Sequence, residues 1–149
     1  MSRAGLTWLI LILLAAPQLR AELLRVPDDF TTIQDAINSA SEGDRIEIAP
    51  GHYTEALSLK GGITIAGTGF EPEDVVLEGE GQARIGTLLD DPRLLVLENL
   101  LLREGFAIHG AGLYLENARI RLDRVHFWGC GSMLEGGAIF ARNVDFEAT

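Results

Sequence analysis

Cysteine is nearly absent from this sequence, because Cys130 is the only one among 149 residues. No intramolecular disulfide is possible, so the fold depends on packing or on repeated hydrogen-bond ladders. No histidine or acid can be assigned to Cys130 as a partner from the sequence. We therefore interpret it as a small core residue rather than a nucleophile.

Basic side chains are also scarce, with 12 Lys and Arg against 22 Asp and Glu and a net charge of −10. An acidic surface repels phosphate backbones and anionic lipids. We expect no nucleic-acid partner and no peripheral docking on membranes. The acidic residues are interpreted as a solvated surface.

Long hydrophobic runs are missing, apart from residues 6–16. This run has the length of a signal-peptide core and is shorter than the about 20 residues that span a bilayer. Arg3 precedes it, Pro17 breaks it, and Ala21 offers a small residue for cleavage. We predict a signal peptide over residues 1–21, with an uncleaved N-terminal anchor as the alternative.

Cleavage at that point leaves 22 acidic and 10 basic residues, a net charge of about −12. It implies an exported protein that is periplasmic, on the cell surface or extracellular. No stable membrane span is expected after the signal is removed.

One helix is predicted over residues 31–40. Thr31 and Gln34 fit a capping box, and Gly43 follows the end of the helix. Its apolar face has the spacing i, i+3, i+4, i+7 and consists of Ile33, Ala36, Ile37 and Ala40.

After the helix, apolar and polar residues alternate in runs of three to five residues that Gly, Asn, Asp or Pro separate. The clearest runs are 45–48, 63–65, 113–115, 120–122 and 144–146. No later helical segment is visible, which excludes a doubly wound sheet. A sandwich, a barrel or a stacked solenoid remains.

Internal repeats favour the solenoid. Segments that start at Leu97, Leu122 and Ala141, 25 and 19 positions apart, each place two polar residues before an apolar–x–apolar triplet. Residues 110–114 are echoed by residues 136–140. A period of about 20 to 25 residues with three short strands corresponds to one coil of a parallel β-helix, whose inward residues stack about 4.8 Å apart.

We therefore predict an all-β parallel β-helix of four to five coils over residues 45–149. Residues 22–44 supply a first strand and an amphipathic helix that caps one open end. The chain stops at Thr149 without a visible C-terminal cap. We expect an incomplete, truncated β-helix, or an open last coil that a partner buries, which includes end-to-end association.

The interior of the coils is predicted to be apolar, with inward positions that include Ile46, Ile65, Leu113 and Phe146. Three asparagines are candidates for the coil corners, where their amides bond neighbouring backbone. They are Asn99, Asn117 and Asn143.

The chain resembles the N-terminal part of pectin-lyase-like right-handed β-helix proteins in four successive segments, residues 26–37, 43–48, 50–55 and 63–67. The resemblance covers residues 26–69 and implies a right-handed coil. That superfamily includes pectin methylesterases and the periplasmic solenoids of nitrous-oxide reductase maturation.

The C-terminal part is similar to the repeats of polymorphic outer-membrane and adhesin-type proteins. The resemblance rests on residues 136–139, followed by a strand that ends at Phe146. Those repeats close with Asn three residues after the Phe, where this chain has Cys130 in one copy and Thr149 in the other.

Gly51, Tyr53 and Glu55 match a pattern found early in pectin methylesterases. The later Asp, Gln and Arg motifs of that family have no counterpart here. We interpret Gly51 as a corner, Tyr53 as a cover of the helix cap, and Glu55 as solvated or bonded to backbone. No catalytic residue is assigned, and the chain is predicted not to be an enzyme.

No cofactor or metal site is predicted. Asp90 and Asp91 beside Pro92 indicate a turn, and the acids around Pro72, namely Glu71, Glu73 and Asp74, indicate a loop. His52, His109 and His126 lack the spacing of a helical zinc pair.

Two aromatic residues are candidate ligand contacts. Tyr114 is expected to point outward between Leu113 and Leu115, and Trp128 follows an inward Phe127. Outward aromatic rings on a solenoid can stack on sugars.

The functional expectation is an exported non-catalytic module for surface interaction, adhesion or polysaccharide contact, with a polysaccharide or another protein as partner. The alternative is the N-terminal piece of a carbohydrate-active esterase or lyase.

Overall fold

The computed structural model describes residues 20–147, so nearly all of the predicted signal peptide (residues 1–21) lies outside the described part. About 53% of the structure is strand. The strands are β1 (Leu23–Val26), β2 (Arg45–Ile48), β3 (Gly51–Tyr53), β4 (Leu57–Ser58), β5 (Thr64–Gly67), β6 (Val75–Glu78), β7 (Gly86–Leu89), β8 (Leu94–Arg103), β9 (Phe106–His109), β10 (Leu113–Trp128), β11 (Gly131–Glu135) and β12 (Ile139–Phe146). The helices are α1 (Ile33–Ser39) and the 3-10 turn η1 (Pro72–Asp74).

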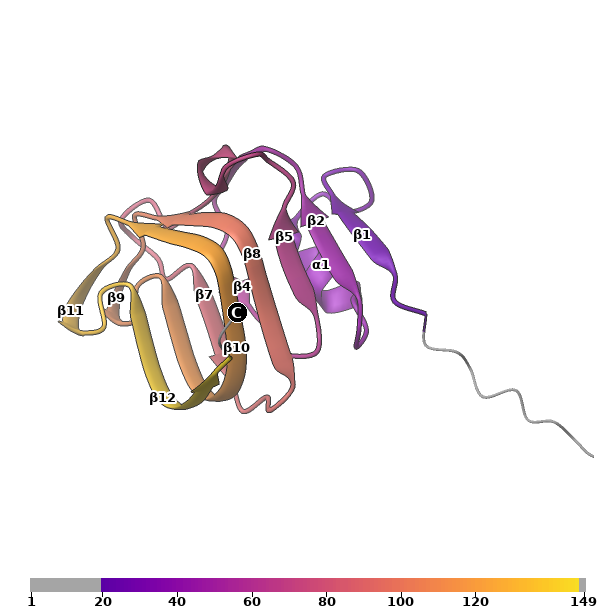
Figure 1. The fold of residues 1–149 in the computed structure, drawn as a ribbon. Helices are drawn as coiled ribbons and strands as arrows, with labels where there is room; N and C mark the ends of the chain where they lie inside the picture. Colours follow the sequence, from indigo (N-terminus) through magenta and orange to yellow (C-terminus); the bar gives the residue numbers. More distant parts are fainter. Residues whose placement is uncertain (1–19, 148–149) are drawn as a thin grey trace, which may run out of the picture.

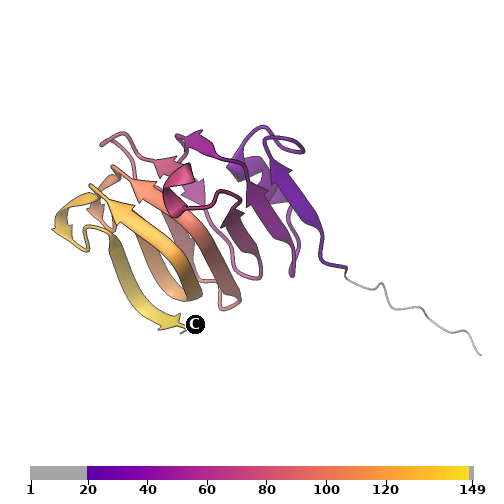
Figure 2. The same ribbon diagram turned by 45° about the horizontal axis from the view of Figure 1, so that its top comes forward.

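The strands wind into a parallel β-solenoid of about five turns, which confirms the predicted stacked architecture (Figures 1 and 2). Three faces follow one another around each coil. Face A consists of β1, β2, β5, the first half of β8, the middle of β10 and the end of β12. Face B consists of β3, β6 and the second halves of β8 and β10. Face C consists of β4, β7 and the first parts of β10 and β12.

The core is a column of apolar side chains from successive coils. On face A, Ile46 pairs with Ile65, and Ile65 pairs with Leu97. Ile46 and Ile65, like Leu113 on face C, are at most 1% exposed, as predicted for inward positions. The prediction for Phe146 is wrong, because its side chain is 49% exposed. It pairs with the buried Ile120, but no described residue stacks on its other side.

Three strands, β8, β10 and β12, are longer than the three to five residues predicted, because corners do not interrupt them. β10 has 16 residues and passes from face C over face A to face B. Single residues with φ near +50° turn these corners while the ladder of strand pairing continues. Asn tolerates this left-handed backbone better than most residues. The corner residues in β8, β10 and β12 are Asn99, Asn117, Arg124 and Asn143.

The repeat alignment needs one correction. Leu97 pairs with Leu122, as aligned, and residues 113 and 114 pair with 139 and 140. Ala141, however, pairs with Leu115 and not with Leu122. The segment that starts at Leu115 has the same pattern, two polar residues before an apolar–x–apolar triplet. The pattern occurs at both short corners of a coil, because each corner needs a polar residue with left-handed backbone before the chain enters the next face.

Helix α1 packs Ile33, Ala36 and Ile37 into the apolar core, consistent with the predicted cap. The capping box predicted with Thr31 and Gln34 is wrong, because the helix starts one residue later. Thr32 is the N-cap, and its hydroxyl accepts a hydrogen bond from the Asp35 amide at 3.1 Å.

The coil between Ile65 and Leu97 is longer than its neighbours because residues 68–74 form an excursion that includes η1. The excursion is tied to face B two coils further along. The Arg124 guanidinium lies 3.0 Å from Glu71, and His126 Nδ1 lies 2.6 Å from Glu73. None of the helices within residues 20–147 is long and apolar enough to cross a membrane.

Candidate ligand-binding groove

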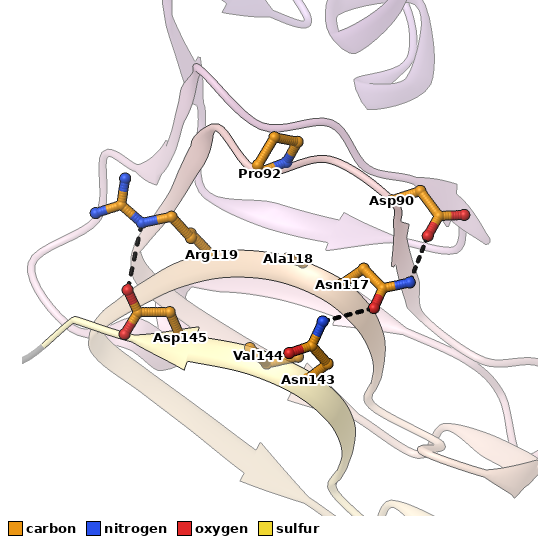
Figure 3. A pocket seen from close by; sticks show the side chains of 8 residues that line it. All are labelled: Asp90, Pro92, Asn117, Ala118, Arg119, Asn143, Val144 and Asp145. Carbon is orange, nitrogen blue, oxygen red and sulfur yellow. Dashed lines mark hydrogen bonds and ion pairs between the residues drawn. The ribbon is translucent and has the colours of Figure 1, made fainter.

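An open groove of about 610 Å³ lies at the corner between faces C and A (Figure 3). It extends over the coils of β7, β10 and β12, so its walls come from residues about one coil apart. Its lining residues are Asp90, Pro92, Asn117, Ala118, Arg119, Asn143, Val144 and Asp145.

One side of the groove is a row of polar side chains that runs along the solenoid (Figure 3). Asn143 Nδ2 donates to Asn117 Oδ1 at 2.8 Å, and Asn117 Nδ2 donates to Asp90 Oδ1 at 2.6 Å. All three residues have φ between 49° and 52°, so each turns the same corner in successive coils. The row orients the amides and leaves further donor and acceptor positions on them for a ligand.

The other side of the groove carries an ion pair. Arg119 Nε lies 3.4 Å from Asp145 Oδ2, and Arg119 also bonds to the Glu147 carboxylate. Both Arg119 and Asp145 are well exposed, with 44% and 66% of their side-chain surface accessible. The groove therefore presents carboxylates, amides and a guanidinium, a set suited to many hydroxyl groups rather than to one strong charge.

Tyr114 points outward on face C, as predicted, but its ring is not free. Phe140 from the next coil stacks on it with ring centroids 5.1 Å apart, and the Arg84 guanidinium from the preceding coil lies 4.6 Å from its centroid. Its hydroxyl donates to Glu116 at 3.1 Å. Tyr114 is thus packed between two coils, which leaves only its edge for a ligand.

Trp128 is 69% exposed at the end of β10 on face B. Since Tyr114 lies on face C, the structure does not bring the two predicted contact residues together. Of these two residues, only Trp128 presents an accessible ring.

The histidines lie apart. His52 Nδ1 is 3.4 Å from Glu78, His126 is bonded to Glu73, and His109 packs on the Phe140 ring at 5.1 Å. Between residues 20 and 147, no group of three or more His, Cys, Asp or Glu side chains is arranged to hold a metal ion.

Cys130 is partly buried against the core. Burial raises the pKa of its thiol, which disfavours the nucleophilic thiolate. The interpretation of Cys130 as a packing residue agrees with this environment.

Sequence reasoning placed Asn117 and Asn143 in corners and Asp90 in a turn, but did not place them side by side. The signal that predicts the row is their spacing of 27 and 26 residues, which is one coil. Asn99 behaves as predicted at the other corner, where its amide donates to the carbonyls of Gly67 and Gly69 at 3.1 and 2.7 Å.

Comparison with protein-family models, with curated proteins and with solved structures gives no match for this chain.

Proposed function

We propose that the chain is an exported, non-catalytic module of the pectin-lyase-like right-handed β-helix type that contacts polysaccharide. The observation that carries the proposal is the row of Asp90, Asn117 and Asn143 in an open groove. Corner amides repeat along the axis at about the 4.8 Å spacing of stacked strands. A regular array of donors and acceptors matches a polymer that repeats its hydroxyl groups along its length.

The charge of the protein narrows the ligand to an uncharged polysaccharide. After cleavage of the signal peptide the net charge is about −12, so the protein as a whole repels a polyuronate. Arg119 is the only basic residue that lines the groove, and Asp145 and Glu147 already neutralise it.

The arrangement of the groove carboxylates supports a binding role. Glycoside hydrolysis uses one carboxyl group that donates a proton and a second that acts as base or nucleophile. Asp90 accepts a hydrogen bond from Asn117, and Asp145 is paired with Arg119. Both carboxylates thus hold neighbouring side chains in place.

Export is supported by the sequence of residues 1–21, which has the charge, apolar core and small residue of a signal peptide. The N-terminus of the secreted chain, measured by mass spectrometry, tests this part. We expect it to begin at Glu22. An unprocessed chain retained inside the cell contradicts export.

Binding is tested by sedimentation of the purified chain with insoluble neutral polysaccharides, and with pectin as the charged comparison. Arg119→Gln is expected to weaken binding at least threefold because it releases Asp145 and reshapes the groove wall. Arg121→Gln is the matched control, since Arg121 lies on the same strand but does not line the groove. Equal loss in both variants, or no binding to any polysaccharide, contradicts the proposal.

The alternative, a carbohydrate-active enzyme, has one candidate cluster of charged side chains. On face B, Glu78 Oε1 lies 2.6 Å from Arg103, and Glu78 Oε2 lies 3.4 Å from His52. Hydrogen bonding to Arg103 holds the pKa of Glu78 below its usual value, so this carboxylate is ionised at neutral pH. Release of methanol or unsaturated sugar from pectin, abolished by Glu78→Gln, would establish the enzyme instead.

A further inference from the structure

Asp44 is a buried carboxylate in the turn between helix α1 and strand β2. With 5% of its surface exposed, it is the one charged side chain that is buried among residues 20–147. Its Oδ2 accepts the Ser41 amide at 2.6 Å, and its Oδ1 accepts the Glu22 amide at 2.7 Å. Asp44 therefore ties the turn after the capping helix to the residue that precedes β1.

Both hydrogen-bond donors to Asp44 are neutral amides, although a buried carboxylate is stabilised best by a positive charge. Within the part of the chain that the structure describes, no basic side chain forms an ion pair with Asp44. The adjacent Arg45 pairs with Glu98 instead. Lys60, from the next coil, donates to the carbonyl of Ala40. The carboxylate of Asp44 thus lacks the cation that its burial calls for.

The backbone of Glu22 is held in place on both sides of its Cα atom. Its nitrogen donates to Asp44, and its carbonyl accepts the Arg45 amide at 2.9 Å, which continues the pairing of β1 with β2. β1 and α1 lie together at the N-terminal end of the solenoid (Figure 1). Arg20 and Ala21, which precede Glu22, are exposed, so their removal uncovers no core.

Cleavage after Ala21, the predicted end of the signal peptide, changes the nitrogen of Glu22. Hydrolysis breaks the peptide bond and adds one water, so that the Ala21 carbonyl becomes a carboxylate and the Glu22 nitrogen becomes an α-ammonium group. An α-amino group has an ordinary pKa of about 8, so most of it is positively charged at pH 7. The charge that cleavage creates therefore appears at the nitrogen that lies 2.7 Å from Asp44.

We propose that removal of the signal peptide completes the fold, because the new α-ammonium group of Glu22 forms a buried ion pair with Asp44. This proposal rests on the export that is part of the proposed function. In the uncleaved chain the same nitrogen offers only a neutral amide. A hydrogen bond from a charged donor is about twice as strong as one from a neutral donor. The N-terminal end of the solenoid is therefore closed firmly only after cleavage, and the uncleaved chain unfolds more readily.

The test compares two forms of the chain that starts at Glu22, both released from a fusion protein by a site-specific protease. One form keeps its free α-amino group. In the other form this group is acetylated, which restores the neutral amide of the uncleaved chain, and mass spectrometry checks that Lys60, the only lysine, is unmodified. In chemical denaturation, we expect the folding equilibrium constant of the free form to be about fivefold to tenfold larger.

Two variants locate the source of this difference. Asp44→Asn keeps a hydrogen-bond acceptor and removes the negative charge, so we expect the free and acetylated forms to differ by less than about twofold. Glu42→Gln is the matched control, because Glu42 lies in the same turn but is exposed, and it is expected to keep the full difference. Circular dichroism checks that every variant is folded.

Hydrogen exchange in the unchanged chain gives a second measurement that does not depend on the folding of Asp44→Asn. The amides of Ser41 and Arg45 bond to Asp44 and to the Glu22 carbonyl, so they report on this end of the solenoid. We expect both amides to exchange more slowly in the free form than in the acetylated form. Equal exchange rates in the two forms would contradict the ion pair.

Three outcomes of the denaturation experiments would overturn the proposal. They are equal stability of the free and acetylated forms, the full difference in Asp44→Asn, and an equal loss of the difference in Asp44→Asn and Glu42→Gln. All three leave export and polysaccharide binding untouched. A secreted chain cleaved at another residue overturns this proposal but not export, whereas an unprocessed chain retained inside the cell contradicts both.

Discussion

The guanidinium of Arg45 on β2 lies 2.7 Å from the carboxylate of Glu98 on β8, although β5 runs between these two strands. Arg45 also lies 3.5 Å from Glu47. The bridge is possible because Ala66, which separates Glu47 from Glu98 in the outward column, is small. Ala66 is only 1% exposed although it faces outward, so the bridge covers it.

Removal of this bridge is expected to destabilise the solenoid slightly. Arg45→Gln leaves two carboxylates facing each other across Ala66, and we expect a loss of about 0.5 to 1 kcal/mol in the free energy of unfolding. Chemical denaturation measures it. The loss is expected to shrink in about 1 M salt, where charges are screened. A loss in the control Arg121→Gln as large as in Arg45→Gln would contradict this explanation.

Two substitutions of Asn117 distinguish the cost of its backbone conformation from the contribution of its side-chain hydrogen bonds. Asn117 has a φ of 49° and bonds both Asp90 and Asn143. Asn117→Gly keeps the left-handed backbone accessible and loses only the side-chain bonds, with an expected cost of about 1 kcal/mol.

Asn117→Ala loses the same bonds and adds the steric cost of a left-handed backbone conformation. We expect it to lower the free energy of unfolding by about 1 kcal/mol more than Asn117→Gly does. Denaturation of the two variants side by side measures the difference. An alanine variant as stable as the glycine variant would show that the corner is not strained.

Glu55 holds the start of the capping helix from another coil. Its two carboxylate oxygens accept the amides of Ile33 and Gln34, at 2.9 and 3.0 Å. These are among the amides that a helix leaves without internal partners. Glu55→Ala is expected to cost about 1.5 to 3 kcal/mol and to speed hydrogen exchange at Ile33 and Gln34 first. Unchanged exchange at these two amides would mean that the helix start is held by Thr32 alone.

Acid is expected to weaken the connection between β7 and β8. Asp91 accepts two hydrogen bonds from the Arg93 side chain, at 2.9 and 2.7 Å, and one from the Gly61 amide at 2.8 Å. Chiefly because of Arg93, the pKa of Asp91 falls from 3.8 to about 2. A depressed pKa stabilises the folded state above the unfolded-state pKa, and this stabilisation disappears as the pH falls from about 4 to 2.

Asp91→Asn is therefore expected to lose about 1 to 2 kcal/mol at pH 7. The difference from the unchanged protein should vanish near pH 2. Asp123→Asn, at an exposed position on face A, is the control. Denaturation of both variants between pH 2 and pH 7 measures the effect. A stability difference between Asp91→Asn and the unchanged protein that is independent of pH would contradict the role of Asp91.

Local pattern was sufficient for the type of fold. The alternation around Ile46 and Leu113 identified inward strand positions, and the spacing of Ile33, Ala36 and Ile37 identified the helix. These features repeat within a few residues, so the backbone geometry of a strand or a helix alone relates them to one buried face.

The register in which the coils stack, and the groove that depends on it, could not be predicted from local sequence pattern. Ala141 has two equally good partners by pattern, Leu115 and Leu122, and the structure pairs it with Leu115. The row from Asp90 to Asn143 exists only once that register is set.

The sequence by itself thus determined an all-β chain of short alternating runs with one amphipathic helix, because side-chain periodicity is a local property. Only the tertiary structure decided which corners stack, that Glu55 caps a helix about 20 residues before it, and where Trp128 and Tyr114 face. Parallel pairing joins residues 19 to 32 positions apart, and the length of each turn between them sets the register. Turn length depends on what each excursion packs against, as residues 68–74 do on face B, and no local pattern contains that information.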